Sequence, residues 1–166
     1  MAAFPDDPIF LSNRLDWAIL RNGWSTLYCK QVVLETDLAW FKKEDFEIID
    51  IDCSDWDTPE SIHESLSRNL SFPGYYGYNL DALNDSLSNV QISTAGLIVV
   101  LRNFHLAEAD IRQKIVDIFA NNSRRHILFG RKLILLLQVD SRDFDVADVG
   151  SCPVPWNNAE IFRSKK

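Results

Sequence analysis

The chain has 166 residues, of which 46% are hydrophobic, and carries a formal net charge of −7. That length and apolar content suffice for one domain with a sizeable core, and no apolar stretch reaches the roughly 18 residues that a membrane-spanning helix needs. The N-terminal segment has acids before any base and lacks a continuous apolar run, so it does not look like a secretory signal. We therefore expect a cytoplasmic protein without a membrane span.

The charge is distributed unevenly along the chain. Residues 1–68 contain 14 Asp and Glu against 6 Lys and Arg, whereas residues 69–166 contain 10 acids and 11 bases. Nine of the acids, and no Lys or Arg, fall within Glu44–Glu64. A surface of one sign attracts cationic partners and repels nucleic acid. The sequence therefore predicts a basic protein partner and no direct binding to DNA or RNA.

The first recognisable unit alternates strand, helix and strand. Trp24–Lys30 reads as a strand, Leu34–Lys43 has apolar residues at helical spacing, and Phe46–Cys53 reads as a strand again. This order is typical of a βαβ unit.

The next segment has clear helix boundaries. Thr58 is well placed as an N-cap with Pro59 at the first helical position, and the apolar stripe that follows ends before Phe72-Pro73-Gly74. A second short helix is predicted over Asn79–Leu87.

Two continuous apolar runs, Leu97–Leu101 and Leu133–Leu137, have the length of strands buried on both faces. Between them the pattern predicts a helix over Asp110–Ala120. Strands that alternate with helices predict an α/β fold with a small, mostly parallel sheet, extended by an N-terminal βα segment. We expect irregular structure after Asp140.

The segment Phe72–Leu87 carries the candidate functional residues. On a helix, Leu80, Leu83 and Leu87 share one arc, Asp81, Asp85 and Ser88 share another, and Asn84 lies between the two. The loop before it holds three tyrosines together with Gly74 and Gly77, which permit a tight turn. No Lys or Arg occurs between Arg68 and Arg102. Two interpretations stay open: a surface for a basic partner, or a helix start that favours acids above packed tyrosines.

The segment from Pro73 to Asp85 resembles the P-x-Y-Y-G-x-N-x-D-A-L-x-D signature of the barstar family, and the order of elements over residues 46–138 is similar as well. The resemblance implies a single barstar-like domain over 1–166, with a core at 46–138 and extensions at 1–45 and 139–166. It also implies a non-catalytic ribonuclease inhibitor. The expected partner-binding residues are Tyr75, Tyr76, Tyr78, Asn79, Asp81, Asn84, Asp85 and Ser88.

By the same resemblance, the partner is a basic ribonuclease or a ribonuclease toxin domain, and the protein is an immunity protein against it. Tyr75, Asp81 and Asp85 match inhibitory contact positions, with Asp85 imitating a substrate phosphate. The chain departs from the family at three of its positions. Asn84 stands where the best-known member has Trp, Tyr78 replaces an acid, and Asn121 lies near an expected Glu, followed by an insertion over Ser123–Gly130.

The remaining motifs predict little chemistry. The three histidines (His63, His105 and His126) lack metal-ligand spacing and are expected at the surface or at helix caps. The three cysteines (Cys29, Cys53 and Cys152) are expected to be free thiols. No cofactor or metal is expected. The rival hypotheses are a barstar-fold binding module for a basic non-nuclease protein and a hydrolase that uses the Asp81 and Asp85 carboxylates.

Overall fold

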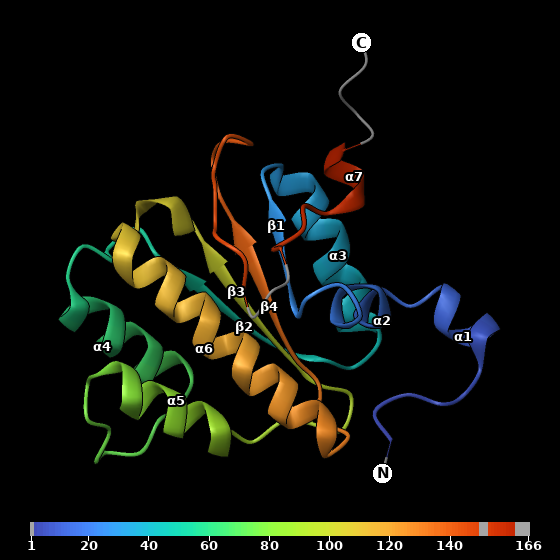
Figure 1. Cartoon of the computed structure of the whole chain (residues 1–166), viewed down its shortest axis with the longest axis horizontal. Coiled ribbons are helices and arrows are strands. Elements are labelled where there is room, and N and C mark those ends of the chain that lie inside the picture. The colour runs from blue at the N-terminus through green and yellow to red at the C-terminus, as the bar shows by residue number, and fades with distance from the viewer. Residues whose placement is uncertain (1, 150–152, 162–166) are drawn as a thin grey trace.

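The computed structural model describes residues 2–149 and 153–161 (Figure 1). In chain order its elements are α1 (Pro8–Ser12), α2 (Leu15–Leu20), β1 (Ser25–Tyr28), α3 (Gln31–Lys43), β2 (Glu47–Asp52), α4 (Pro59–Asn69), α5 (Leu80–Asn89), β3 (Leu97–Arg102), the 3-10 helix η1 (Phe104–Leu106), α6 (Ala109–Leu128), β4 (Leu133–Gln138) and α7 (Asn158–Ile161).

The four strands form one parallel sheet in the order β1-β4-β3-β2. The chain crosses from β1 to the far edge at β2 through α3, then returns strand by strand. Because each parallel crossover is right-handed, opposite directions of travel place the connecting helices on opposite faces. Figure 1 shows α4, α5 and α6 on one side of the sheet and α2 and α3 on the other. The α/β fold with its parallel sheet is confirmed.

The two central strands are apolar because both of their faces are covered. Leu97, Val99 and Leu101 of β3 pack with α4, α5 and α6, whereas Ile98 and Val100 pack with α2 and α3. All five side chains are at most 1% exposed. Full burial on both faces is what a continuous apolar strand requires.

The predicted N-terminal βα segment is confirmed. β1 pairs with β4 in parallel, and α3 covers the second face of the sheet. The short helices α1 and α2, which the sequence did not predict, precede it. Within α4, Thr58 caps the helix through a reciprocal pair of bonds with Ser61, and Pro59 takes the first helical position, as predicted.

The C-terminal segment differs in part from the irregular structure expected of it. It closes the outer edge of β1, because the amide of Leu27 donates to Pro155 O and the amide of Asn157 donates to Leu27 O. The helix α7 follows and places Glu160, which is fully buried, under the start of α3. One Glu160 oxygen accepts hydrogen bonds from the amides of Cys29 and Lys30. A distant side chain therefore binds the two backbone amides that lead into α3.

The expected end of the last long helix was wrong. Helix α6 runs on from Ala120 to Leu128, so the segment taken as an insertion, Ser123–Gly130, consists mostly of further helical turns. Its inner face carries Ser123, whose hydroxyl donates to Leu133 O, and His126. None of the helices in the described residues is long and apolar enough to cross a membrane.

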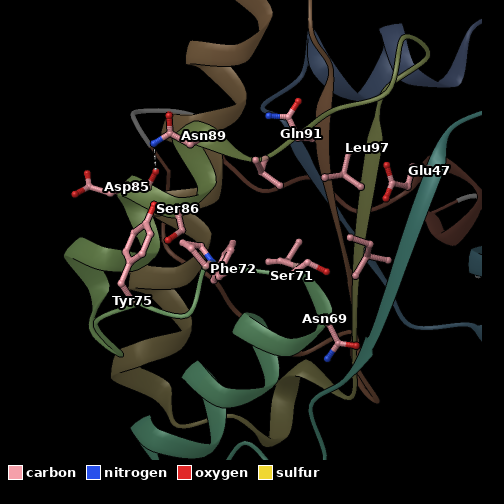
Figure 2. A pocket seen from close by; sticks show the side chains of 14 residues that line it. Glu47, Asn69, Ser71, Phe72, Tyr75, Asp85, Ser86, Asn89, Gln91 and Leu97 are labelled. Atoms are coloured by element: carbon pink, nitrogen blue, oxygen red, sulfur yellow. Dashed lines mark hydrogen bonds between the residues drawn. The ribbon is translucent and has the colours of Figure 1, made fainter.

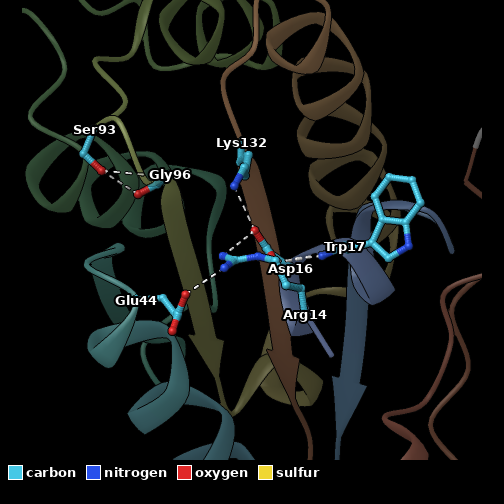
Figure 3. Close-up of polar contacts among 7 residues, drawn as sticks. All are labelled: Arg14, Asp16, Trp17, Glu44, Ser93, Gly96 and Lys132. Atoms are coloured by element: carbon cyan, nitrogen blue, oxygen red, sulfur yellow. Dashed lines mark hydrogen bonds and ion pairs between the residues drawn. The ribbon is translucent and has the colours of Figure 1, made fainter. Parts of the chain in front are cut away.

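A buried ionic cluster fixes the N-terminal segment to the sheet (Figure 3). Asp16 of α2 is fully buried and pairs with Lys132, at the start of β4, at 2.9 Å. Arg14 also pairs with Asp16, at 2.9 Å, and with Glu44, after α3, at 2.7 Å. One carboxylate thus joins α2 to β4, and through Arg14 to the end of α3.

Replacing Asp16 by Ala should lower the free energy of unfolding by about 3 kcal/mol, because Lys132 and Arg14 lose their buried partner. Urea titration followed by tryptophan fluorescence measures the change. Asp143→Ala, at an exposed position, is the matched control and should change stability little. Equal stability of the two variants would contradict the role given to the cluster.

Candidate functional site

Helix α5 presents its acids because its apolar side is held in the core. Leu83 and Leu87 are fully buried between the sheet and α6, while Asp81 and Asp85 are exposed on the outer side. Leu80, expected to face inward with them, is only half-buried. No hydrogen bond or ion pair within the described part of the chain engages the Asp81 or Asp85 carboxylate. Both charges are therefore free to meet a partner.

The three tyrosines of the preceding loop have different environments. Tyr75 is 89% exposed and Tyr78 52%, whereas Tyr76 is only 6% exposed. Tyr76 was expected to contact the partner, but its ring is in the core, against Phe72 and Tyr78 at centroid distances of 5.0 and 5.1 Å. We therefore exclude Tyr76 from the binding surface and assign it to the support of the loop.

The buried end of Tyr76 is held by a histidine from α4. Its hydroxyl is hydrogen bonded to Nδ1 of His63. Burial and the neighbouring Tyr78 raise the pKa of Tyr76 to about 12, so its hydroxyl stays protonated at neutral pH. Burial lowers the pKa of His63, although Glu60 opposes that shift. The neutral imidazole therefore suits this site.

Backbone geometry also fixes the loop. The amide of Tyr76 donates to Pro73 O at 2.9 Å, and Tyr78 takes a left-handed φ of 50°. A Cβ on Gly77 would come within 3.2 Å of Asn79 Nδ2, so glycine suits that position. A Cβ on Gly74 would meet only open space. Contrary to the expectation from the sequence, space at this position does not require glycine. The left-handed backbone at Tyr78 is strained, and such strain persists only where the surrounding structure holds it in place.

Three polar side chains near the two acids form hydrogen bonds within the chain; they belong to Asn79, Asn84 and Ser88. Asn79 caps α5, since its Oδ1 accepts from the amide of Ala82 and its Nδ2 donates to Gly77 O. Asn84 is half-buried and accepts from Nδ2 of Asn122 on α6 at 3.0 Å. The hydroxyl of the half-buried Ser88 donates to Asp85 O. We define the acidic face as Tyr75, Tyr78, Asp81 and Asp85, with Asn79, Asn84 and Ser88 at its margin.

A cleft of about 580 Å³ lies beside the acidic face (Figure 2). One wall is α5 with Asp85 and Asn89, and the opposite wall is the edge strand β2 with Glu47 and Ile49. The loop after α4, including Phe72, forms its floor. The cleft has no signature in the sequence, because its walls are about 40 residues apart in the chain.

Two of the histidines are buried, which corrects the expectation of surface or capping positions. His63 is 2% exposed and His126 is 3% exposed, with Nε2 of His126 at 2.8 Å from Leu87 O. His105 is half-buried and lies 3.4 Å from Asp140. Among the described residues, no group of three or more His, Cys, Asp or Glu is arranged to hold a metal ion.

Two of the cysteines can be placed. Cys29 is partly exposed and Cys53 is buried, and neither forms a disulfide. Burial raises the pKa of the Cys53 thiol, so it stays protonated. Cys152 lies outside the described residues.

Comparison with known proteins gives three findings. Residues 46–138 match the family model described as Barstar (barnase inhibitor). The Bacillus subtilis (strain 168) protein named "Putative ribonuclease inhibitor YrdF" is 43% identical over 58 residues, which are 34% of this chain and 60% of that protein. A chain in the structure titled "Structure of Drosophila ORC bound to AT-rich DNA and Cdc6" aligns with a TM-score of 0.48 at 15% identity, over 87% of this chain and 55% of that one. A TM-score this low carries no argument about function.

The His63–Tyr76 contact predicts a pH dependence of stability. Because the pKa of His63 is lowered in the folded state, the unfolded chain binds its proton more readily, and stability should fall as the pH drops below about 6.5. Urea titrations between about pH 7.5 and pH 5 measure this loss. His63→Gln, which keeps an acceptor for Tyr76, should show a smaller loss over the same range. An identical pH profile for the two proteins would contradict the assignment.

Proposed function

The chain belongs to the barstar family, and we propose that it is a non-catalytic inhibitor that binds a basic ribonuclease and blocks its active site. The observation that carries the proposal is the pair of exposed carboxylates on α5, Asp81 and Asp85, which have no counter-charge within the described chain. A ribonuclease active site binds a polyanion and is therefore cationic, so the two surfaces are complementary in charge.

The rigidity of the acidic face favours tight binding. Asp85 stands in for a substrate phosphate by accepting charge-assisted hydrogen bonds from Arg or Lys of the enzyme. Tyr75 offers a large exposed ring beside it. The loop under Tyr75 is held by Tyr76, by the cap at Asn79 and by the turn at Pro73, so little conformational entropy is lost on association.

We propose further that the protein acts in the cytoplasm as an immunity protein against a ribonuclease toxin. The departures from the family support a target of its own. Asn84 is hydrogen bonded to Asn122 and offers a partner much less apolar area than an aromatic residue would. Asn121 is exposed on α6 but carries no charge. The first difference removes apolar contact area and the second removes a charge. A nuclease that fits other members of the family should therefore bind this protein more weakly.

Titration of purified microbial ribonucleases with the protein, using a fluorogenic RNA substrate, tests the proposal. We expect one nuclease to be inhibited at a one-to-one ratio. Asp85→Ala should weaken the free energy of binding to that nuclease by about 2–5 kcal/mol, because the enzyme's cations are left buried without a partner. Most of the loss should appear as faster dissociation.

The exposed Asp145→Ala is the matched control and should bind as the wild type does. Equal affinity of the Asp85 and Asp145 variants would refute the role of Asp85. Tight binding to a basic protein without nuclease activity would instead support the rival hypothesis of a binding module.

Association should also depend strongly on salt. Raising the ionic strength from about 0.01 M to about 0.5 M shortens the Debye length from about 30 Å to a few Å. The long-range attraction of a basic enzyme is then screened, and the association rate constant should fall about tenfold or more. Stopped-flow fluorescence measures that rate. A rate constant independent of salt would show that the acidic face does not guide the encounter.

A further inference from the structure

We propose that the cleft between α5 and β2 binds an arginine-bearing segment of the same nuclease, outside that enzyme's active site. The inference rests on the proposed function and extends it, because it adds a second contact region that selects the partner. Three observations carry it: the shape of the cleft, the charge of its rim, and its continuity with the acidic face.

The cleft has the shape for a partly apolar occupant. Ile49, Leu70, Phe72 and Val90 supply its apolar lining, and Asn69, Asn89 and Gln91 supply polar groups. Figure 2 shows Glu47 and Leu97 on the strands facing Asp85 and Asn89 across the opening. A volume of about 580 Å³ exceeds that of one side chain and accommodates a short peptide segment.

The rim carries charge of one sign. The lining includes the acids Glu47 and Asp85 and contains no Lys or Arg. Within the described part of the chain, neither carboxylate takes part in an ion pair or a side-chain hydrogen bond. The nearest arginine on the sheet, Arg102, is already bound by Asp50 and Glu35 at the other end of β2. The lining of the cleft therefore supplies no counter-charge for these two carboxylates, and a cationic partner can supply one.

Arginine fits these walls better than lysine does. Its methylene stem can pack along Ile49 and Phe72 while the guanidinium reaches Glu47 at the mouth. The planar guanidinium also stacks on aromatic rings and binds a carboxylate through two parallel hydrogen bonds. Both types of partner are present in the lining, in Phe72, Tyr75 and the two carboxylates.

The cleft is continuous with the acidic face, because Tyr75 and Asp85 belong to both. A nuclease that contacts Asp85 through its active site therefore brings its neighbouring surface over the cleft. A basic loop beside that active site is the segment placed to enter it. Such a contact selects among nucleases whose active sites are alike but whose loops differ.

The test uses two peptides and NMR of the full isotope-labelled chain. The probe is acetyl-Leu-Arg-Leu-amide, and its control is the same peptide with neutral citrulline in place of arginine. We expect saturable chemical-shift changes at the amides of Ile49, Phe72 and Asn89. The citrulline peptide should bind with an affinity about fivefold lower than that of the arginine peptide. Glu47→Gln should weaken the arginine peptide about fivefold, whereas Glu64→Gln, an exposed position on α4 outside the cleft, should not.

Shifts scattered over the surface, equal binding of the two peptides, or an unchanged Glu47→Gln would each overturn the inference. Nuclease titration separates this result from the proposed function. Peptide binding without inhibition of any ribonuclease refutes the proposed inhibitor while keeping the cleft as a site for a basic segment. Inhibition that is weakened by Asp85→Ala but not by Glu47→Gln keeps the inhibitor and refutes the cleft.

Discussion

The apolarity of β3 and β4 on both faces is the constraint on which the rest of the fold depends. Two such strands need cover above and below, and residues 46–138 provide helices for one face only, because their crossovers all run in one direction. The N-terminal segment supplies the second cover, fixed in place by Asp16 and its cations. On the first face, α5 turns Asp81 and Asp85 outward, and neither carboxylate has a partner within the described residues.

Burial and exposure alternate along the loop of the site, and that alternation gives the surface its rigidity. Tyr75 is exposed, Tyr76 is anchored below it, and Tyr78 is exposed again with a left-handed backbone. One buried hydroxyl, bound to His63, therefore holds two rings outside the core. A loop fixed in this way is ordered before any partner arrives, so the shape of the acidic face depends on α4, which itself carries none of its residues.

The sequence predicted the elements whose patterns are local. Thr58 and Pro59 marked the start of α4, and the apolar runs marked β3 and β4. It failed where a long-range partner decides the outcome. Tyr76 and Tyr75 look alike in the motif, and long-range contacts of Tyr76, above all the one with His63, separate them. His63 does lie at the flank of the apolar stripe of α4, and Asn122 and His126 continue the stripe of α6, so this periodicity contained a signal for their burial. The cleft and the hydrogen bonds from Cys29 and Lys30 to Glu160 had no such signal.

The two edge strands of the sheet differ in whether another segment covers them, and this difference affects contacts between copies of the protein. The edge at β1 is closed by residues 155–157, whereas β2 is paired only with β3 among the described strands. An open edge strand invites another chain to add to the sheet. Here that strand carries Glu47, Asp50 and Asp52. Asp50 is paired with Arg102, but Glu47 and Asp52 form no ion pair within the described residues, so their charges disfavour the pairing of two identical edges. The same charges that suit a basic partner therefore oppose edge-to-edge association of two copies of the protein.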